Sequence, residues 1–166
     1  MDCQVNSNIN NQIFEIGKKI PNWDILRIGT NNVPKTNDFE KKPLVVLFFS
    51  LSCPGCLGRA IPFANRIVYE NGDSINVVGI HTHFEGPETT DEKLLAAKEE
   101  FYIRFPYYRD AGFASTFYKY KAGGTPHWVV VDENGIVVES LFGSDPNRAL
   151  LRLDYILSEL KENNKI

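Results

Sequence analysis

The sequence has few cysteines, little net charge and no long apolar run, and each of these absences excludes a class of protein. Three cysteines in 166 residues do not make the disulfide framework of a small secreted domain. A net charge of −3 argues against a nucleic-acid-binding protein, which would carry a basic face. The most apolar run, residues 44–49, has the length of a strand, well short of the ~20 residues of a membrane span.

The start of the chain also lacks a targeting pattern. Met1-Asp2-Cys3-Gln4 shows no basic region followed by an apolar one, so as written it is not a secretory signal. We therefore expect a cytoplasmic protein, or a periplasmic one if a leader was removed. Residues 1–15 are rich in Asn, Gln and Ser, which predicts a flexible tail with Cys3 as a solvent-exposed thiol. The remainder, 16–166, has the length of a single domain.

Two cysteines three positions apart, Cys53 and Cys56, follow that apolar run. A C-x-x-C between a strand and a helix is typical of a redox pair. We expect Cys53 at the helix start, where unpaired N–H groups favour a thiolate, which is the nucleophile. Pro54 suits a first helical turn because it needs no N–H partner. Gly55 leaves room for the backbone of a partner to approach the sulfurs.

Two other interpretations of the pair are weaker. Half of a zinc site would need two more ligands at suitable spacing, and Cys3 and the three histidines do not supply them. A purely structural disulfide is also a poor explanation, because closing so short a loop constrains little of the unfolded chain.

Periodicity and turn signals predict the order of the elements. A buried strand over 44–51 should lie at the centre of a sheet covered on both faces. The chain then gives a helix from Cys53 to about residue 70, kinked at Pro62, a strand over 75–84 and a helix over 90–105 capped by Thr90 or Asp91. After an extended segment (105–110) and a short helix (112–120), strands 128–131 and 136–141 form a hairpin. A final helix starts at Ser144 or Asp145. This order predicts an α/β domain.

Two motifs in this order resemble the thioredoxin superfamily. They are Cys53-Pro54-Gly55-Cys56 after an apolar strand and Gly124-Thr125-Pro126 before Trp128-Val129-Val130-Val131-Asp132. More narrowly, residues 16–160 look like the TlpA-like thiol-disulfide oxidoreductases, which overlap in sequence with the alkyl hydroperoxide reductase/thiol-specific antioxidant (AhpC/TSA) group.

The resemblance implies a thioredoxin-like fold, a central mixed β-sheet with helices on both faces, and a dithiol that reduces or exchanges protein disulfides. Pro126 matches the cis-proline beside the cysteines, and Thr125 offers its backbone to a substrate chain as one added strand. Ser52, Pro54 and Gly55 would also contact the substrate. The expected partners are a disulfide-containing protein and an electron-donor thiol protein. We expect a monomer with no organic cofactor, no metal and no membrane span.

Two departures from the family concern the proton of Cys56 and the partner. Thioredoxin carries a buried acid six residues before its first cysteine, where this chain has Leu47, and many members have Trp where this chain has Ser52. Glu85, at the end of the second strand, is a candidate proton shuttle. His127, next to Pro126, either lies near the sulfurs and lowers a thiolate pKa or points to the other face of the sheet.

Three alternatives remain. A peroxiredoxin-type peroxidase would present P-x-x-x-[ST]-x-x-C; Ser50 is at the right offset from Cys53, but Val46 stands in place of the proline. A copper carrier would use Cys53, Cys56 and His127 as ligands, and His81, His83 and Glu85 alternate as a second candidate metal set. A binding module without catalysis is disfavoured by the intact cysteine pair.

Overall fold

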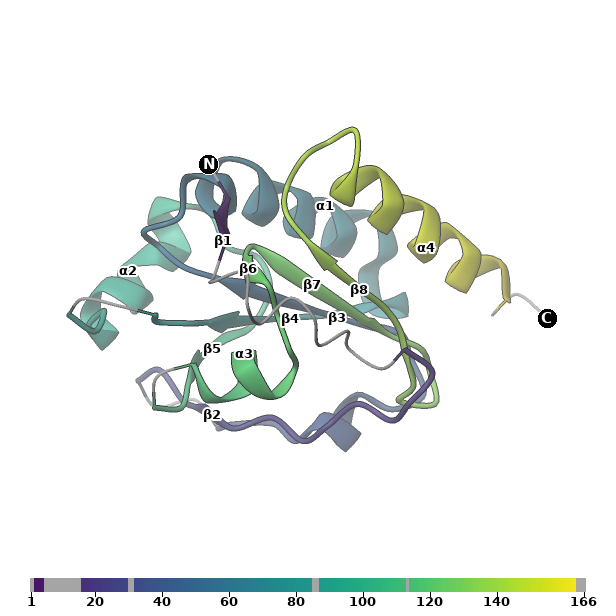
Figure 1. Cartoon of the computed structure of the whole chain (residues 1–166), viewed down its shortest axis with the longest axis horizontal. Coiled ribbons are helices and arrows are strands. Elements are labelled where there is room, and N and C mark those ends of the chain that lie inside the picture. The colour runs from purple at the N-terminus through teal and green to yellow at the C-terminus, as the bar shows by residue number, and fades with distance from the viewer. Residues whose placement is uncertain (1, 5–15, 30–31, 85–86, 113, 164–166) are drawn as a thin grey trace.

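The computed structural model describes residues 2–4, 16–29, 32–84, 87–112 and 114–163 (Figure 1). A six-stranded mixed sheet forms its centre. In spatial order the strands are β2 (Ile25–Leu26), β5 (Tyr107–Asp110), β4 (Asn76–His81), β3 (Leu44–Phe49), β7 (His127–Val131) and β8 (Val137–Phe142). The pairs β3–β4 and β4–β5 are parallel, and the other three pairs are antiparallel. The predicted mixed sheet is confirmed.

Strand β3 is buried along its whole length, as its continuous apolar run predicts. Successive side chains of a strand point to opposite faces, and β3 follows this rule. Val45, Leu47 and Phe49 belong to one core cluster, and the residues between them belong to the other. Both faces of β3 are covered, and the chain reaches the surface just after the strand, at the exposed Ser52.

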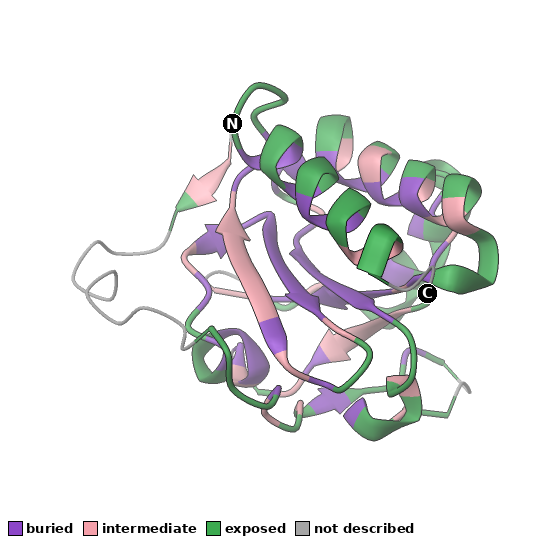
Figure 2. Cartoon of the chain, turned by 90° about the vertical axis from the view of Figure 1, so that its right-hand side faces the viewer, coloured by how far each residue is buried: buried purple, intermediate pink, exposed green. Residues whose placement is uncertain are grey.

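In the part of the chain that the structure describes, four α-helices accompany the sheet: α1 (Ile61–Asn71), α2 (Asp91–Glu100), α3 (Ser115–Lys119) and α4 (Ala149–Asn163). Helices α1 and α4 cover one face, and their buried residues turn toward the strands while exposed residues turn outward (Figure 2). Helix α3 packs on the other face, together with the segment around Ile20 and Ile25. Among the described residues, no helix is long and apolar enough to cross a membrane.

The described residues also contain shorter turns. The 3-10 turn η2 (Thr36–Phe39) precedes β3, and the 3-10 turn η4 (Gly72–Ser74) follows α1. A π-helical turn, η3 (Cys56–Ala60), precedes α1. The kink predicted at Pro62 takes this form: Pro62 stands in the first turn of α1, and the Ile61 N–H reaches back to the Cys56 carbonyl. Proline has no N–H to continue a regular ladder, so the irregular turn comes just before it.

Several predicted boundaries differ from the structure. Thr90 caps α2 as expected, but the helix ends at Glu100, because Tyr102 has a positive φ of 54° that breaks the helical path. Strand β4, predicted over 75–84, ends at His81, three residues before the predicted end. Helix α4 begins at Ala149 and is not capped by Ser144, because Asp145 first forms a turn, accepting the Asn147 N–H at 2.8 Å.

The N-terminal stretch contains a strand that the sequence did not predict. β1 (Cys3–Gln4) pairs antiparallel with β6 (Gly124–Thr125), the segment just before Pro126. Met1 and residues 5–15 of the predicted tail lie outside the described residues. The N-terminal strand β1 therefore lies next to the predicted Gly124-Thr125-Pro126 motif (Figure 1).

Candidate active site

A tight turn after β3 places Cys53 at the start of a helix, as predicted. The Cys53 N–H donates to the Ser50 carbonyl at 3.1 Å, and the Ser52 N–H donates to the Ser50 hydroxyl at 3.3 Å. The Cys53 carbonyl then accepts the N–H groups of Cys56 and Leu57 at 3.1 and 3.2 Å, which opens the helical turn. These bonds hold Cys53 at the positive end of the helix, where a negative charge is stabilised.

The two thiols of the pair lie in unequal electrostatic surroundings. The Cys56 N–H points at the Cys53 sulfur at 3.3 Å. The hydrogen bond from the Cys56 thiol, assisted by Thr125 and this N–H, outweighs burial and lowers the pKa of Cys53 from 9.0 to about 5. Burial, and then hydrogen bonding to Cys53 and its charge, raise the pKa of Cys56 well above its usual range. Cys53 is therefore the thiolate at neutral pH, and Cys56 keeps its proton.

The segment before Pro126 lies against the cysteine pair. The Thr125–Pro126 peptide bond is cis, as the family resemblance implied. The Thr125 carbonyl lies 3.4 Å from the Cys53 sulfur. Pro126 in turn accepts the Gly143 N–H through its carbonyl at 2.8 Å, which ties the loop after β8 to the same place. Two sequence motifs seventy residues apart thus meet at one site.

Leu47 lies fully buried in the core cluster that contains both cysteines. The position where thioredoxin has an acid therefore adds apolar surface to the cluster that contains Cys56. This surrounding explains why burial is the largest cause of the raised pKa of Cys56.

His127 does not lie near the sulfurs; the structure supports the other orientation left open by the sequence. Residues 127 and 128 point to opposite faces, and Trp128 belongs to the cysteine-side cluster. The His127 ring packs near Phe48, with Nδ1 accepting the Gly123 N–H at 3.2 Å and Nε2 bonded to the Ser140 hydroxyl at 2.8 Å. Burial lowers the pKa of His127 to about 3, so its ring is neutral and cannot stabilise the Cys53 thiolate.

Of the second predicted set, His81 has a clear structural position. It is buried at the end of β4, packs edge-on against Phe49, and its Nε2 accepts the Leu51 N–H at 3.2 Å. Burial lowers the pKa of His81 to about 4, so it holds the turn before Cys53 as a neutral acceptor. Glu85 lies outside the described residues. Within the described part of the chain, no group of three His, Cys, Asp or Glu side chains is arranged to hold a metal ion.

Three residues near the site were missed by sequence reasoning: Asp2, Cys3 and Ser144. Cys3 is half-buried against Thr125 and Cys53, so the prediction of a solvent-exposed thiol is wrong. The only sequence signal was that Cys3 is the one cysteine outside the pair. The contact joins residues at opposite ends of the chain, and local patterns carry no information on it.

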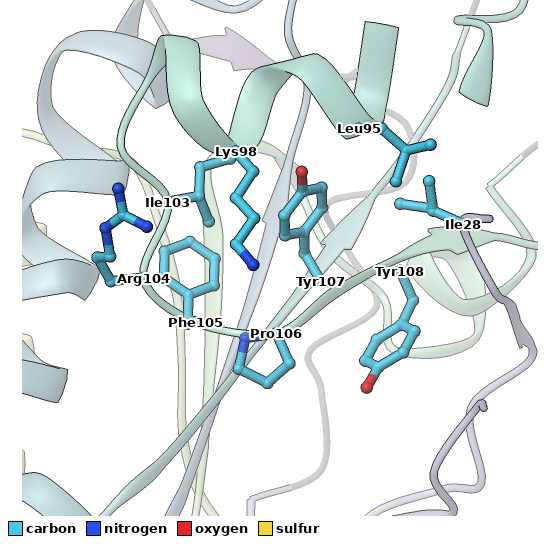
Figure 3. Close-up of a pocket in the computed structure, with 9 residues that line it drawn as sticks. All are labelled: Ile28, Leu95, Lys98, Ile103, Arg104, Phe105, Pro106, Tyr107 and Tyr108. Carbon is cyan, nitrogen blue, oxygen red and sulfur yellow. The ribbon is translucent and has the colours of Figure 1, made fainter. Parts of the chain in front are cut away.

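A separate pocket lies between α2 and β5 and is lined by apolar and aromatic side chains, with Lys98 between Phe105 and Tyr107 and Arg104 to one side (Figure 3). None of the three cysteines lines it. The chemistry-bearing residues are therefore grouped at the cysteine turn and not in this pocket.

The fold and the cysteine turn define a thioredoxin-like α/β protein, and solved structures similar to it include thiol-disulfide oxidoreductases. A thiol-disulfide isomerase from Corynebacterium glutamicum is 29% identical, with a TM-score of 0.74 over 85% of this chain and 96% of that one. A thioredoxin-like superfamily protein is also 29% identical, with a TM-score of 0.75 over 86% and 95%. The thioredoxin domain of a thiol-disulfide oxidoreductase from Bacteroides vulgatus is 19% identical (TM-score 0.68, 86% and 98% covered) and shares the fold.

Residues 16–140 match the AhpC/TSA family, and the chain belongs to that family. Comparison with curated protein sequences gives no match.

Proposed function

We propose that this protein is an enzyme that reduces or exchanges disulfides of protein substrates through Cys53 and Cys56. The observation that carries the proposal is the difference between the two thiols. Cys53 is a stabilised thiolate beside the Thr125 carbonyl, and Cys56 is a protonated thiol that donates to it. This is the arrangement that a nucleophile and a resolving thiol need.

The reaction follows from that arrangement. The Cys53 thiolate attacks one sulfur of a substrate disulfide, the substrate S–S bond breaks, and the other substrate sulfur leaves as a thiolate. Cys56 then loses its proton to the leaving group and attacks the Cys53 sulfur. The mixed disulfide breaks, the Cys53–Cys56 disulfide forms, and the substrate has gained two electrons. A thiol protein that reduces the Cys53–Cys56 disulfide completes the cycle.

The test uses a protein disulfide substrate and variants of each cysteine. We expect Cys53→Ser to abolish exchange and Cys56→Ser to accumulate a mixed disulfide between Cys53 and the substrate, detected by mass spectrometry. Ser158→Ala, an exposed change on α4, serves as the matched control and retains full activity. Full turnover by Cys56→Ser would refute the two-cysteine mechanism.

Hydrogen peroxide separates this proposal from the peroxidase alternative. The Ser50 hydroxyl, which that alternative would use, is bonded to the Ser52 hydroxyl at 2.9 Å. Rapid peroxide turnover through Cys53 with a thiol donor, unchanged in Cys56→Ser, would favour the peroxidase.

A further inference from the structure

The strand β1 occupies the edge of β6 beside the cysteine pair in the way an extended peptide would. Cys3 lies opposite Thr125 and Gln4 lies opposite Gly124 in an antiparallel pair. A side chain at residue 124 would prevent this approach, because a Cβ there would lie 2.2 Å from the Cys3 carbonyl oxygen. Addition of a strand to an exposed edge gives main-chain affinity, and side-chain pockets then give specificity.

The Cys3 thiol lies beside the predicted nucleophile in this arrangement. It is half-buried and interacts with Cys53: burial, and then the Cys53 charge and hydrogen bond, raise the pKa of Cys3. The same hydrogen bond is among the causes that lower the pKa of Cys53. A sulfur on this added strand therefore meets the nucleophile directly.

A second contact recognises the residue before that cysteine. The Ser144 N–H donates to Asp2 Oδ2 at 2.9 Å, and the Ser144 hydroxyl donates to Oδ1 at 2.6 Å. Ser144 is 1% exposed with Asp2 in place, so both hydrogen bonds are shielded from solvent. A Cβ on Gly55 would lie 2.0 Å from Asp2 Oδ1, so glycine at this position of the redox motif leaves space for the carboxylate. Two donors aimed at two oxygens match a carboxylate, since charged acceptors form the stronger bonds.

The residue before Ser144 is held in place by two hydrogen bonds. Gly143, next to Ser144, donates its N–H to the Pro126 carbonyl at 2.8 Å and accepts the Trp128 indole N–H at 2.9 Å. Trp128 is fully buried in the cysteine-side core. These bonds connect the segment that holds the Ser144 donors to Pro126, next to β6, and to the core.

We propose that β6, Gly55 and Ser144 form a peptide-recognition site that selects an extended chain with an acidic residue immediately before the reacting cysteine. Asp2–Gln4 occupies this site as an internal substrate mimic and competes with a substrate. The proposal rests on the proposed function and adds the substrate class: disulfides formed by the cysteine of an Asp-Cys or Glu-Cys pair.

The test compares two short peptides that are identical except for Asp-Cys or Asn-Cys, each as a mixed disulfide with a thionitrobenzoate reporter. Reduced protein should release the reporter about tenfold faster from the Asp-Cys peptide, equivalent to about 1.4 kcal/mol. Ser144→Ala removes one of the two donors and should reduce this preference to about threefold, while Ser158→Ala should leave it intact. Asp2→Asn should lower the half-saturating concentration of the Asp-Cys peptide severalfold at an unchanged maximal rate, because the internal competitor is weakened.

A binding measurement separates this inference from the proposed function. Redox-inert peptides carrying Ser in place of Cys should shift the amide signals of Thr125 and Ser144 in NMR spectra, with tighter binding of the Asp-Ser peptide than of the Asn-Ser peptide. Selective binding without disulfide exchange would refute the proposed function and support the recognition site. Exchange at equal rates with both disulfide peptides, or a preference that Ser144→Ala leaves unchanged, would overturn the recognition site and leave the proposed function standing.

Discussion

Removal of the Cys56 thiol should raise the pKa of Cys53. The hydrogen bond from that thiol is the largest cause of the low pKa of Cys53, about 5 against 9.0 for an ordinary cysteine. A hydrogen bond to a charged group contributes roughly 1.5–3 kcal/mol, and 1.36 kcal/mol corresponds to one pKa unit. Cys56→Ala should therefore raise the pKa of Cys53 by about one to two, because the backbone N–H of residue 56, Thr125 and Cys3 remain as donors.

The assay is the pH dependence of iodoacetamide alkylation at Cys53, checked by thiolate absorbance near 240 nm. The other two thiols do not interfere below pH 8, since the pKa values of Cys3 and Cys56 are both raised. At pH 5 about half of Cys53 should be thiolate in the unmodified chain, and about a tenth or less in Cys56→Ala.

Cys56→Ser is the matched control, because its hydroxyl keeps a donor at the same place and should hold the pKa of Cys53 nearer to 5. An unchanged Cys53 pKa in Cys56→Ala, or a value near 9 in the unmodified chain, would refute this explanation of the nucleophile.

Three further predictions concern stability. Leu153 on α4 is 0% exposed, so Leu153→Ala should lower the free energy of unfolding, measured in urea, by about 2–5 kcal/mol. Leu151, on the same helix, is 61% exposed, and Leu151→Ala should lower it by less than about 0.5 kcal/mol. Equal losses in the two variants would contradict the packing. Burial lowers the pKa of His127 to about 3, so between about pH 6.5 and 3 the unfolded chain binds a proton at this residue that the folded chain does not. The free energy of unfolding should therefore fall as the pH drops through that range, and it should fall less steeply in His127→Gln. The pKa of Cys53 is lowered from 9.0 to about 5, so the free energy of unfolding of the reduced protein should increase as the pH rises from about 5 to 9. This increase should be absent in Cys53→Ser.

The parts of the fold that the sequence predicted are those set by local signals. The apolar run of β3, the C-x-x-C that follows it and the turn at Gly135 each have a pattern within about ten residues, and the structure has them in place. The ends of elements were less accurate, because tertiary contacts decide them. The predicted helix cap at Ser144 or Asp145 is the clearest case: the Ser144 hydroxyl donates to Asp2, 142 residues away, and Asp145 accepts the Asn147 N–H in a turn before the helix.

The orientation of His127 shows a different limit of the sequence. The sequence shows that His127 follows Pro126, but the face of the sheet to which its side chain points depends on the register between β7 and β3. In the structure His127 pairs with Phe48, and both belong to the side of the sheet away from the cysteines. A shift of one residue in register would reverse that assignment. The absence of an acid at Leu47 could be read directly, and the structure adds only that the position is sealed in the core.

The unequal thiols also bear on the direction of the proposed reaction. A stabilised Cys53 thiolate stabilises the reduced form of the pair, and such stabilisation makes a dithiol couple more oxidising. Thioredoxin, with a nucleophile pKa of about 7, lies near ~−270 mV, and DsbA, with a pKa of about 3.5, lies near ~−120 mV. Because the pKa of Cys53 is about 5, the Cys53–Cys56 couple should lie between these two values. Equilibration in glutathione buffers with thiol trapping measures it. A potential at or below that of thioredoxin would mean that the apolar surroundings of Cys56 offset the stabilised thiolate, and the chain would then act mainly as a reductant.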